Sequence, residues 1–289
     1  MLNEYGKIIK LNRELLCIKQ DYICSKIGIS KSHLSRMERN KENISLENVK
    51  SIFKAMDIEM ANQNINEIFE EDFFKFYKNI AYDLDCQNEY QKIQSYSKYI
   101  KSSFSYVKYL LAQMIYSIVK NKDYNCKSYF YIENYLEYLE SYQIQLFYDY
   151  IAFIFYCNKQ YNHAIHYFQK AKSFKGNDIS QSMLYYHQSL NYRHIGKLSE
   201  ALQYSIKANH LFSETLNIRR LALSKIQQAN IEANKRNFES SINIMLQCIQ
   251  SLLMLNMRGD ISYVYNNLLW TYLLWGKYDK VIELKDEAN

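Results

Sequence analysis

The stretch of sequence that decides the fold is IKQDYICSKIGISKSHLSRMER, residues 18–39. Its apolar residues have helical spacing on either side of Gly28. Glycine readily adopts the left-handed conformation that ends one helix and starts a sharp turn, and Ser30 can then cap the helix that follows. The stretch therefore predicts a short helix over 19–27, a turn at Gly28 and a second helix over 31–39.

Two further helices flank this pair. Residues 2–17 carry apolar side chains at helical spacing, and Ser45 can cap a fourth helix whose apolar positions start at Leu46. Helices joined by a glycine-containing turn in this way form the helix-turn-helix pattern. We therefore expect residues 1–62 to be one small helical domain with that pattern at its centre.

The same residues resemble the Xre/lambda-repressor family of helix-turn-helix proteins. In that family the third helix enters the major groove of DNA with its N-terminal side chains on the base edges. The resemblance assigns this role to four side chains of the 31–39 helix: Lys31, Ser32, Ser35 and Arg36. It also implies that Gln20 opens the second helix and supports the DNA contact, and that Arg13 and Glu38 form a buried pair.

The chemistry of these side chains agrees with a DNA-binding role. Lys31 and Arg36 can donate to O6 and N7 of guanine, and the serines can bond a base or a phosphate. Lys19, Lys41 and the backbone N–H groups at helix starts suit phosphates. Asn40 stands where the family usually has glycine, and asparagine also tolerates the left-handed conformation. The alternative is a small helical domain whose basic residues only face solvent, and the density of matching residues disfavours it.

The composition of the whole chain indicates an all-α protein. Its 289 residues are 48% apolar, enough to bury a sizeable core in one or two domains. Proline is absent and there are only 6 glycines, whereas a strand-rich fold of this size needs many turn residues. The 29 tyrosines suit half-exposed grooves, because the ring can be buried while the hydroxyl stays in water. An AT-rich genome would raise the tyrosine content equally well.

The cysteine content predicts a cytoplasmic protein, and the net charge is mildly basic. The net charge of +6 is compatible with nucleic acid but too small to establish binding. The 6 cysteines are scattered without CxxC pairs, which is typical of reduced thiols: Cys17, Cys24, Cys86, Cys126, Cys157 and Cys248. Uncharged apolar stretches of about eighteen residues are absent, so we expect neither secretion nor membrane spanning.

A unit recurs through the rest of the sequence. The large residue expected to open the second helix of each unit returns at intervals of 34, 37, 37, 40 and 40 residues: Tyr90, Tyr124, Tyr161, Leu198, Phe238 and Tyr278. Small residues such as Ala164 and Ala201 would let two antiparallel helices approach closely. The pattern looks like the tetratricopeptide repeat, whose period is about 34 residues. An irregular helical bundle is the alternative.

Such units stack because none of them can bury its apolar stripe alone. We therefore expect a polar linker over 63–72 and a right-handed tetratricopeptide superhelix over 73–289, used for peptide binding and dimerisation. Its concave groove would be lined by the first helix of each unit. The inward positions include Tyr116, Asp149, Phe153, Tyr156, Tyr186, Leu190, Arg193, Asn230, Asn234, Asn266 and Trp270.

These side chains suit a peptide ligand. Asparagine can pair with a backbone N–H and C=O together, arginine can bind a C-terminal carboxylate, and aromatic rings can hold apolar side chains. Each residue alone could equally be an ordinary groove or core residue. His163 and His166 lie three apart on one helix, but nothing at a fixed spacing completes a metal site. HExxH, GxGxxG, GxxxxGK[ST] and GxSxG motifs are absent, so we expect no metal, no cofactor and no enzyme activity.

The combination of an Xre-type head with a tetratricopeptide tail resembles the RRNPP group of cytosolic peptide-pheromone receptors, with PlcR-like and Rgg-like regulators nearest in layout. The resemblance implies a homodimeric transcriptional regulator that binds a double-stranded DNA operator and is switched by a short signalling peptide in the groove. One alternative is a peptide-independent Xre-family repressor of phage or plasmid control, whose repeats serve dimerisation. Another makes the repeats a scaffold for a protein partner. The apolar last repeat, including Trp270 and Trp275, is a candidate dimer surface.

Overall fold

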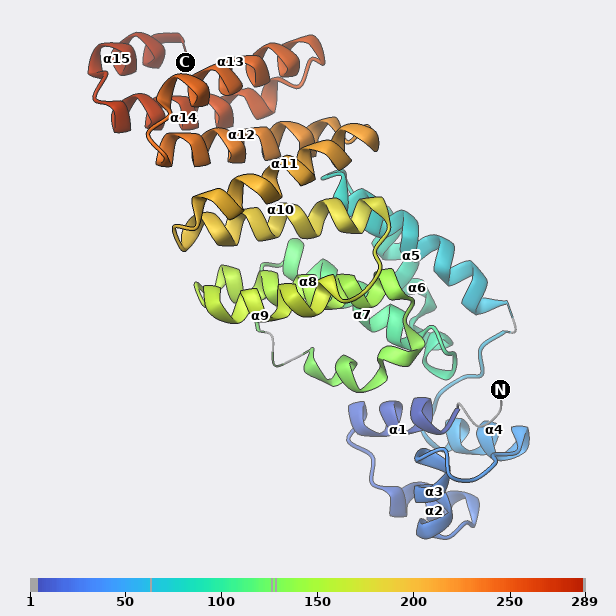
Figure 1. Ribbon diagram of the computed structural model, residues 1–289. Coiled ribbons are helices and arrows are strands. Elements are labelled where there is room, and N and C mark those ends of the chain that lie inside the picture. The colour runs from blue at the N-terminus through green and yellow to red at the C-terminus, as the bar shows by residue number, and fades with distance from the viewer. Residues whose placement is uncertain (1–4, 63, 126, 128, 288–289) are drawn as a thin grey trace. The chain divides into compact units, whose positions relative to one another are not determined.

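The computed structural model is built of helices (Figure 1). It describes residues 5–62, 64–125, 127 and 129–287, and these residues contain no strand, which confirms the all-α prediction. Contacts divide the chain into two compact units: residues 1–80 with 84–140, and residues 81–83 with 141–289. Within the described ranges, no helix has the length and apolarity that a membrane span requires.

The first unit begins with four short helices: α1 (Tyr5–Leu15), α2 (Gln20–Ile27), α3 (Lys31–Glu38) and α4 (Leu46–Ala55). Gly28 ends α2 in the left-handed conformation, with φ 73°. The Ser30 hydroxyl accepts a hydrogen bond from the backbone N–H of His33, and the Ser45 hydroxyl accepts one from Asn48. The predicted turn and both predicted caps are therefore present. Residues 2–4 of the first predicted helix lie outside the described residues.

One apolar core joins these four helices. Side chains from every helix are completely buried in it: Ile8, Ile9, Ile23, Leu34, Met37, Val49, Ile52 and Phe53. Asn40 follows α3 with φ 54°, so asparagine adopts the left-handed turn expected there. In α3 only Leu34, Met37 and Glu38 are buried, so the other residues of this short helix lie at or near the surface.

The segment expected to be a linker is mostly helical. Residue 63 is outside the described residues, but α5 (Ile65–Ala81) covers 65–72. Phe69 and Phe73 are completely buried, so this segment is part of the core of the first unit. Glu67 and Glu71 are exposed, whereas Asp72 is buried and accepts hydrogen bonds from Lys92 and from the Tyr96 hydroxyl. The division between the units falls after residue 140 instead of in this segment.

The remainder of the first unit departs from a regular repeat. It contains α6 (Gln87–Ser95), α7 (Tyr106–Val119) and the 3₁₀ helices Tyr96–Lys98, Ile100–Ser102 and Phe130–Tyr138. Tyr90 lies inside α6 and Tyr124 lies in a loop, so neither opens a helix as predicted. The Asp123 carboxylate accepts hydrogen bonds from Asn125 N–H (3.0 Å) and the Tyr129 hydroxyl (2.9 Å). These local bonds hold the segment in a turn in place of a helix.

The second unit is a stack of four helical hairpins, which the picture shows from yellow-green to red (Figure 1). Its helices are α8 (Ser141–Cys157), α9 (Tyr161–Lys172), α10 (Asp178–His194), α11 (Leu198–Glu214), α12 (Ile218–Asn234), α13 (Phe238–Met254), α14 (Arg258–Trp275) and α15 (Tyr278–Glu287). Four of the six residues predicted to open a second helix do so: Tyr161, Leu198, Phe238 and Tyr278.

The same turn joins both helices of every hairpin. Two residues before each second helix, the backbone takes a positive φ, at Lys159, Gly196, Arg236 and Gly276. Only two of these positions hold glycine, so the turn is imposed by packing of the helices as well as by local preference. Repetition of one turn gives the hairpins a common geometry and lets them stack.

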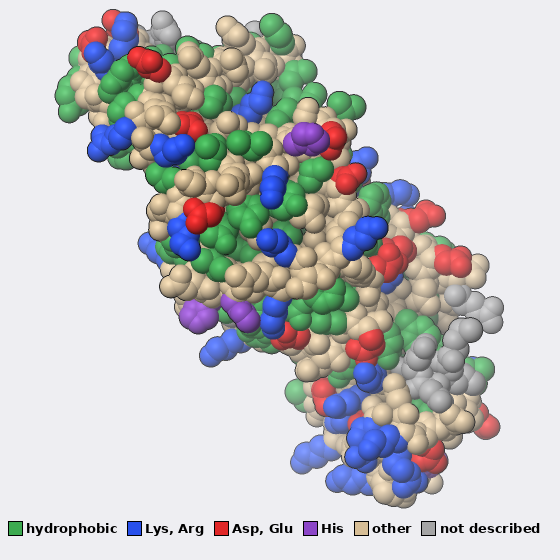
Figure 2. Space-filling model, in the orientation of Figure 1, with side chains coloured by type: hydrophobic (Ala, Val, Ile, Leu, Met, Phe, Trp, Pro, Cys, Tyr) green, Lys and Arg blue, Asp and Glu red, His purple; other side chains and the backbone are tan. Residues whose placement is uncertain are grey.

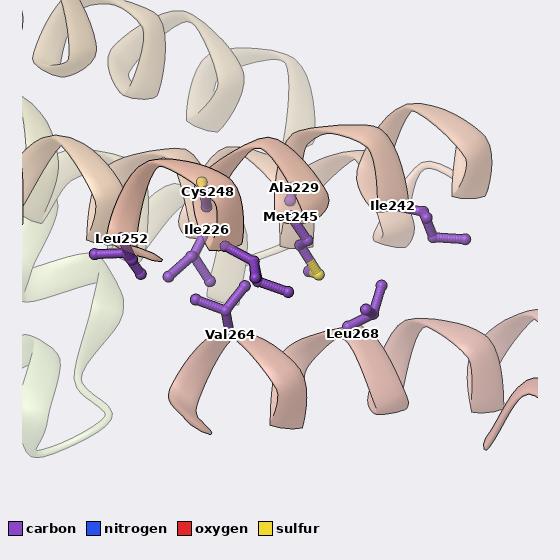
Figure 3. Packing of buried hydrophobic residues seen from close by; sticks show 9 residues of the cluster. Ile226, Ala229, Ile242, Met245, Cys248, Leu252, Val264 and Leu268 are labelled. Atoms are coloured by element: carbon purple, nitrogen blue, oxygen red, sulfur yellow. The ribbon is translucent and has the colours of Figure 1, made fainter. Parts of the chain in front are cut away.

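Apolar side chains fill the space between successive hairpins. In the cluster drawn in Figure 3, α12 supplies Ile226 and Ala229, α13 supplies Met245 and its neighbours, and α14 supplies Val264 and Leu268. Ala164 and Ala201 are completely buried between paired helices, as the repeat pattern predicts. The first helices of the hairpins are therefore held in a fixed register along the array.

Candidate DNA-binding surface and ligand-binding residues of the repeat array

Helix α3 presents the predicted base-contacting residues on its outer face. Leu34 and Met37 are completely buried and fix the helix against the domain core. The side chains on the other side are exposed or half-buried: Lys31, Ser32, Ser35 and Arg36. Because helical residues three and four positions apart share a face, these four side chains form one solvent-facing surface. We call it the recognition face.

Basic side chains gather around the recognition face. Figure 2 shows Lys and Arg concentrated where Figure 1 places α2 and α3. Lys19 precedes the first residue of α2, and Lys41 follows α3. Both are exposed. Their ammonium groups, together with the partial positive charge of the helix N-termini, make this surface suitable for a phosphate backbone.

Two acidic residues pair with the cations of the recognition face, and sequence reasoning missed both. Lys31 Nζ lies 2.9 Å from Asp21 Oδ2, and Arg36 Nε lies 2.7 Å from Glu42 Oε2. Glu42 Oε1 also lies 3.2 Å from His33 Nε2. The hydrogen bond from Arg36 lowers the pKa of the Glu42 carboxyl. The Lys31–Asp21 pair is the more exposed of the two, and exposed ion pairs are weak, so a DNA phosphate can replace Asp21.

Behind the recognition face, one carboxylate connects three helices. Arg13 donates to Glu38 from Nε (2.6 Å) and from Nη2 (2.9 Å), so the pair implied by the resemblance is present. Gln20 Nε2 donates to Glu38 Oε2 at 2.8 Å. The Glu38 hydrogen bond raises the pKa of Arg13. Gln20 therefore supports α3 from behind by binding its last residue.

The residues expected in the peptide groove are divided between the two units. Tyr116 lies in α7 of the first unit, where its ring stacks on Tyr90 at 3.5 Å and its hydroxyl donates to Gln87. The others lie in the second unit on the first helices of the hairpins, α8, α10, α12 and α14: Asp149, Tyr156, Tyr186, Arg193, Asn230, Asn234 and Asn266.

Asp149 is not on the surface of the array. Its side chain is completely buried and lies 3.0 Å from Nδ1 of His187, which is buried as well. The His187 ring also stacks on Phe153 at 4.4 Å. A buried carboxylate needs such a partner, because an unpaired charge in the interior is strongly unfavourable. The prediction that Asp149 contacts a ligand is therefore wrong. Asp149 instead pairs with His187 inside the array.

Tyr156, Tyr186 and Arg193 lie close to one another and are half-buried. Burial raises the pKa of Tyr156 to about 12, and the nearby positive charge of Arg193 opposes that shift. Burial likewise raises the pKa of Tyr186, and the positive charges of Arg220 and, more weakly, Arg193 act against that rise. Burial and Arg193 together lower the pKa of His194. We call Tyr156, Tyr186 and Arg193 the arginine cluster.

The arginine cluster has an uncompensated positive charge. Within the described residues, no acidic side chain pairs with Arg193. The next arginines of the array are occupied: Arg219 contacts Asp260 at 3.0 Å and Asp83 at 3.3 Å, and Arg220 donates to the Ala81 carbonyl at 2.9 Å. A half-buried guanidinium beside tyrosine rings is suited to bind a carboxylate.

The asparagines of the array differ in exposure. Asn230 is half-buried and donates to Asn267 Oδ1 at 2.8 Å, whereas Asn234 and Asn266 are exposed. Carboxamides in this arrangement can donate to and accept from a peptide backbone. The His163 ring stacks on Phe155 and the His166 ring meets Tyr167 edge to face. No group of three metal-binding side chains occurs among the described residues.

Comparisons with known proteins found similar solved structures and one family model. PlcR of Bacillus thuringiensis, solved in complex with the peptide PapR7 and DNA, is 15% identical over 98% of this chain and 92% of that chain, with a TM-score of 0.45. ComR of S. thermophilus, solved with DNA and its signalling peptide ComS, is 15% identical over 92% and 99%, with a TM-score of 0.49. No curated protein matches. Residues 9–61, which hold most of α1 and all of α2 to α4, match the HTH_3 family model, described as helix-turn-helix, and form a helix-turn-helix domain.

Proposed function

We propose that this chain is a sequence-specific DNA-binding transcriptional regulator that acts as a homodimer. The observation that carries the proposal is the recognition face: a helix-turn-helix domain whose third helix presents two cations and two serines at its surface. A single domain of this kind makes few base contacts, so two copies on neighbouring half-sites are needed for useful specificity.

The proposal includes control by a short peptide bound to the first helices of the array. The arginine cluster supports it, because Arg193 has the charge to bind a peptide carboxylate and Tyr156 and Tyr186 have rings to hold an apolar side chain. Asn234 and Asn266 add exposed carboxamides for the peptide backbone. A peptide can switch the regulator only if it binds one conformation more tightly than the other.

The experiment uses peptides from short open reading frames that adjoin the gene. At a concentration of about a hundred times Kd, a specific peptide should stabilise the full chain by about 2.7 kcal/mol, which a melting curve resolves. Arg193→Gln should weaken binding of that peptide by about ten- to a hundredfold. It should not change the affinity for the same peptide with an amidated C-terminus. Lys197→Gln, on an exposed turn, is the matched control.

A peptide-independent repressor, whose repeats serve only dimerisation, is the second candidate. It predicts operator binding with no stabilisation by any of these peptides. Failure to bind any DNA duplex would instead contradict the regulator proposal as a whole.

A further inference from the structure

A loop carboxylate lies beside an arginine of the recognition face. Glu42 Oε2 accepts a hydrogen bond from Arg36 Nε at 2.7 Å, and Glu42 Oε1 lies 3.2 Å from His33 Nε2. Arg36 and His33 are three positions apart on α3, so the carboxylate spans one turn of the helix surface. The contact is made at one edge of the guanidinium.

The fold fixes the backbone from which Glu42 extends. Asn40 takes the left-handed conformation, and the N–H of Lys41 donates to the Arg36 carbonyl at 2.9 Å. This turn directs the chain back along α3. Two residues after Glu42, the side chain of Ile44 is buried in the core. Because the loop is anchored on both sides of Glu42, the fold determines where its carboxylate can lie.

We propose that Glu42 is a positioning residue that sets the DNA sequence preference of Arg36, an inference that rests on the proposed DNA-binding function. A guanidinium has five N–H donors, and Glu42 is bonded at Nε, which leaves the terminal nitrogens for O6 and N7 of guanine. An arginine held in one orientation loses less conformational entropy on binding.

The second ion pair of the recognition face provides a matched control. Asp21 bonds Nζ of Lys31, which is the same nitrogen that would contact DNA. Asp21 therefore competes with DNA for Lys31, whereas Glu42 leaves the contacting nitrogens of Arg36 available. Removal of either acid deletes one negative charge from the same surface, but only removal of Glu42 releases a guanidinium from its orientation.

The test compares Glu42→Ala, Glu42→Gln and Asp21→Ala with the wild-type full chain at one salt concentration. The wild-type chain first selects a duplex from a random library, and dissociation constants are then measured for this duplex and for a scrambled one. We expect Glu42→Ala to lower the ratio of the two constants by about three- to tenfold. Glu42→Gln should keep most of the ratio, because its amide oxygen can still accept from Arg36. Asp21→Ala should tighten binding to the selected duplex and should not lower the ratio, because it frees Lys31 for DNA.

Arg36→Ala, alone and combined with Glu42→Ala, completes a double-mutant cycle. In that background, adding Glu42→Ala should leave the ratio unchanged, because the acid acts through the arginine. Equal effects of Glu42→Ala and Asp21→Ala, or a ratio unchanged by Glu42→Ala, would overturn the positioning role while DNA binding stands. A wild-type chain that selects no sequence would overturn the proposed function and the positioning role together. All variants should melt near the wild-type temperature, because both acids lie at the surface.

Discussion

Glu38 accepts a two-point hydrogen bond from Arg13, with N···O distances of 2.6 and 2.9 Å, and this pair joins α3 to α1. Gln20 adds a bond from α2 to the same carboxylate at 2.8 Å. Only 3% of Glu38 is exposed to solvent. The orientation of the recognition face relative to the rest of the helix-turn-helix domain therefore depends on one buried acid.

Glu38→Ala should destabilise the domain by about 3 kcal/mol, because it leaves the Arg13 guanidinium in a largely buried position without its partner. Chemical denaturation followed by circular dichroism measures the loss. Glu47→Ala, on the exposed side of α4, is the control and should change stability by less than about 0.5 kcal/mol. The double variant Arg13→Met with Glu38→Leu should regain most of the stability. A Glu38→Ala domain as stable as wild type would contradict this account.

Asp149→Ala should lower the stability of the array even when no peptide is present. It removes the partner of a buried histidine and leaves a void, at a cost of about 2–4 kcal/mol. Asp149→Asn keeps an oxygen that can accept from His187 and should cost less. Melting curves without peptide measure both effects. If Asp149→Ala melted like the wild-type chain but lost peptide binding, the buried assignment would be wrong.

The hairpin turns predict opposite effects for two substitutions. Gly196 has φ 77°, and an added Cβ would have no heavy atom within 4 Å. Gly196→Ala should therefore lower the free energy of unfolding by about 1 kcal/mol through backbone strain alone. Lys159 occupies the equivalent turn with φ 59°, and Lys159→Gly should stabilise the chain by about 0.5 kcal/mol. Denaturant midpoints report both changes. Shifts of the same sign would show that turn strain does not determine stability here.

The sequence predicted those parts of the fold that depend on local residues. Gly28 and Ser30 set the turn and cap of the helix-turn-helix, and both are found in the structure. The first residues of α9 and α11, Tyr161 and Leu198, were located by spacing, because each opens a helix directly after a tight turn. Recognition of the outer face of α3 likewise needed only helical periodicity.

Features that depend on distant contacts were not predictable. Asp149 was placed on the surface because its position fits the register of the first helices, but its burial follows from His187 on another helix. Glu42 was missed because its role depends on the left-handed turn at Asn40 that returns the loop to α3. Residues 65–72 were predicted to belong to a linker because most of their side chains are polar, but the structure buries Phe69 of this segment.

The last repeat offers a test of the proposed homodimer. Trp270 is 59% exposed on α14, and Tyr278 and Ile282 are more than half exposed on α15. Trp275 was predicted to be part of the same dimer surface, but it packs within the chain. Its ring stacks on Phe238, with the ring centroids 5.5 Å apart, and contacts the cluster of Figure 3. Exposed tryptophan of this kind contributes strongly to interfaces, often by about 2 kcal/mol or more.

Trp270→Glu should therefore weaken self-association by about thirtyfold and leave the melting temperature almost unchanged. Trp275→Glu should instead lower the melting temperature, because it places a charge against Phe238 and the apolar cluster. A dilution series by analytical ultracentrifugation, run beside melting curves, separates the two effects. A Trp270→Glu chain that dimerises with wild-type affinity would exclude this face of α14 as the dimer surface, and Trp270 would then remain available for a ligand of the array.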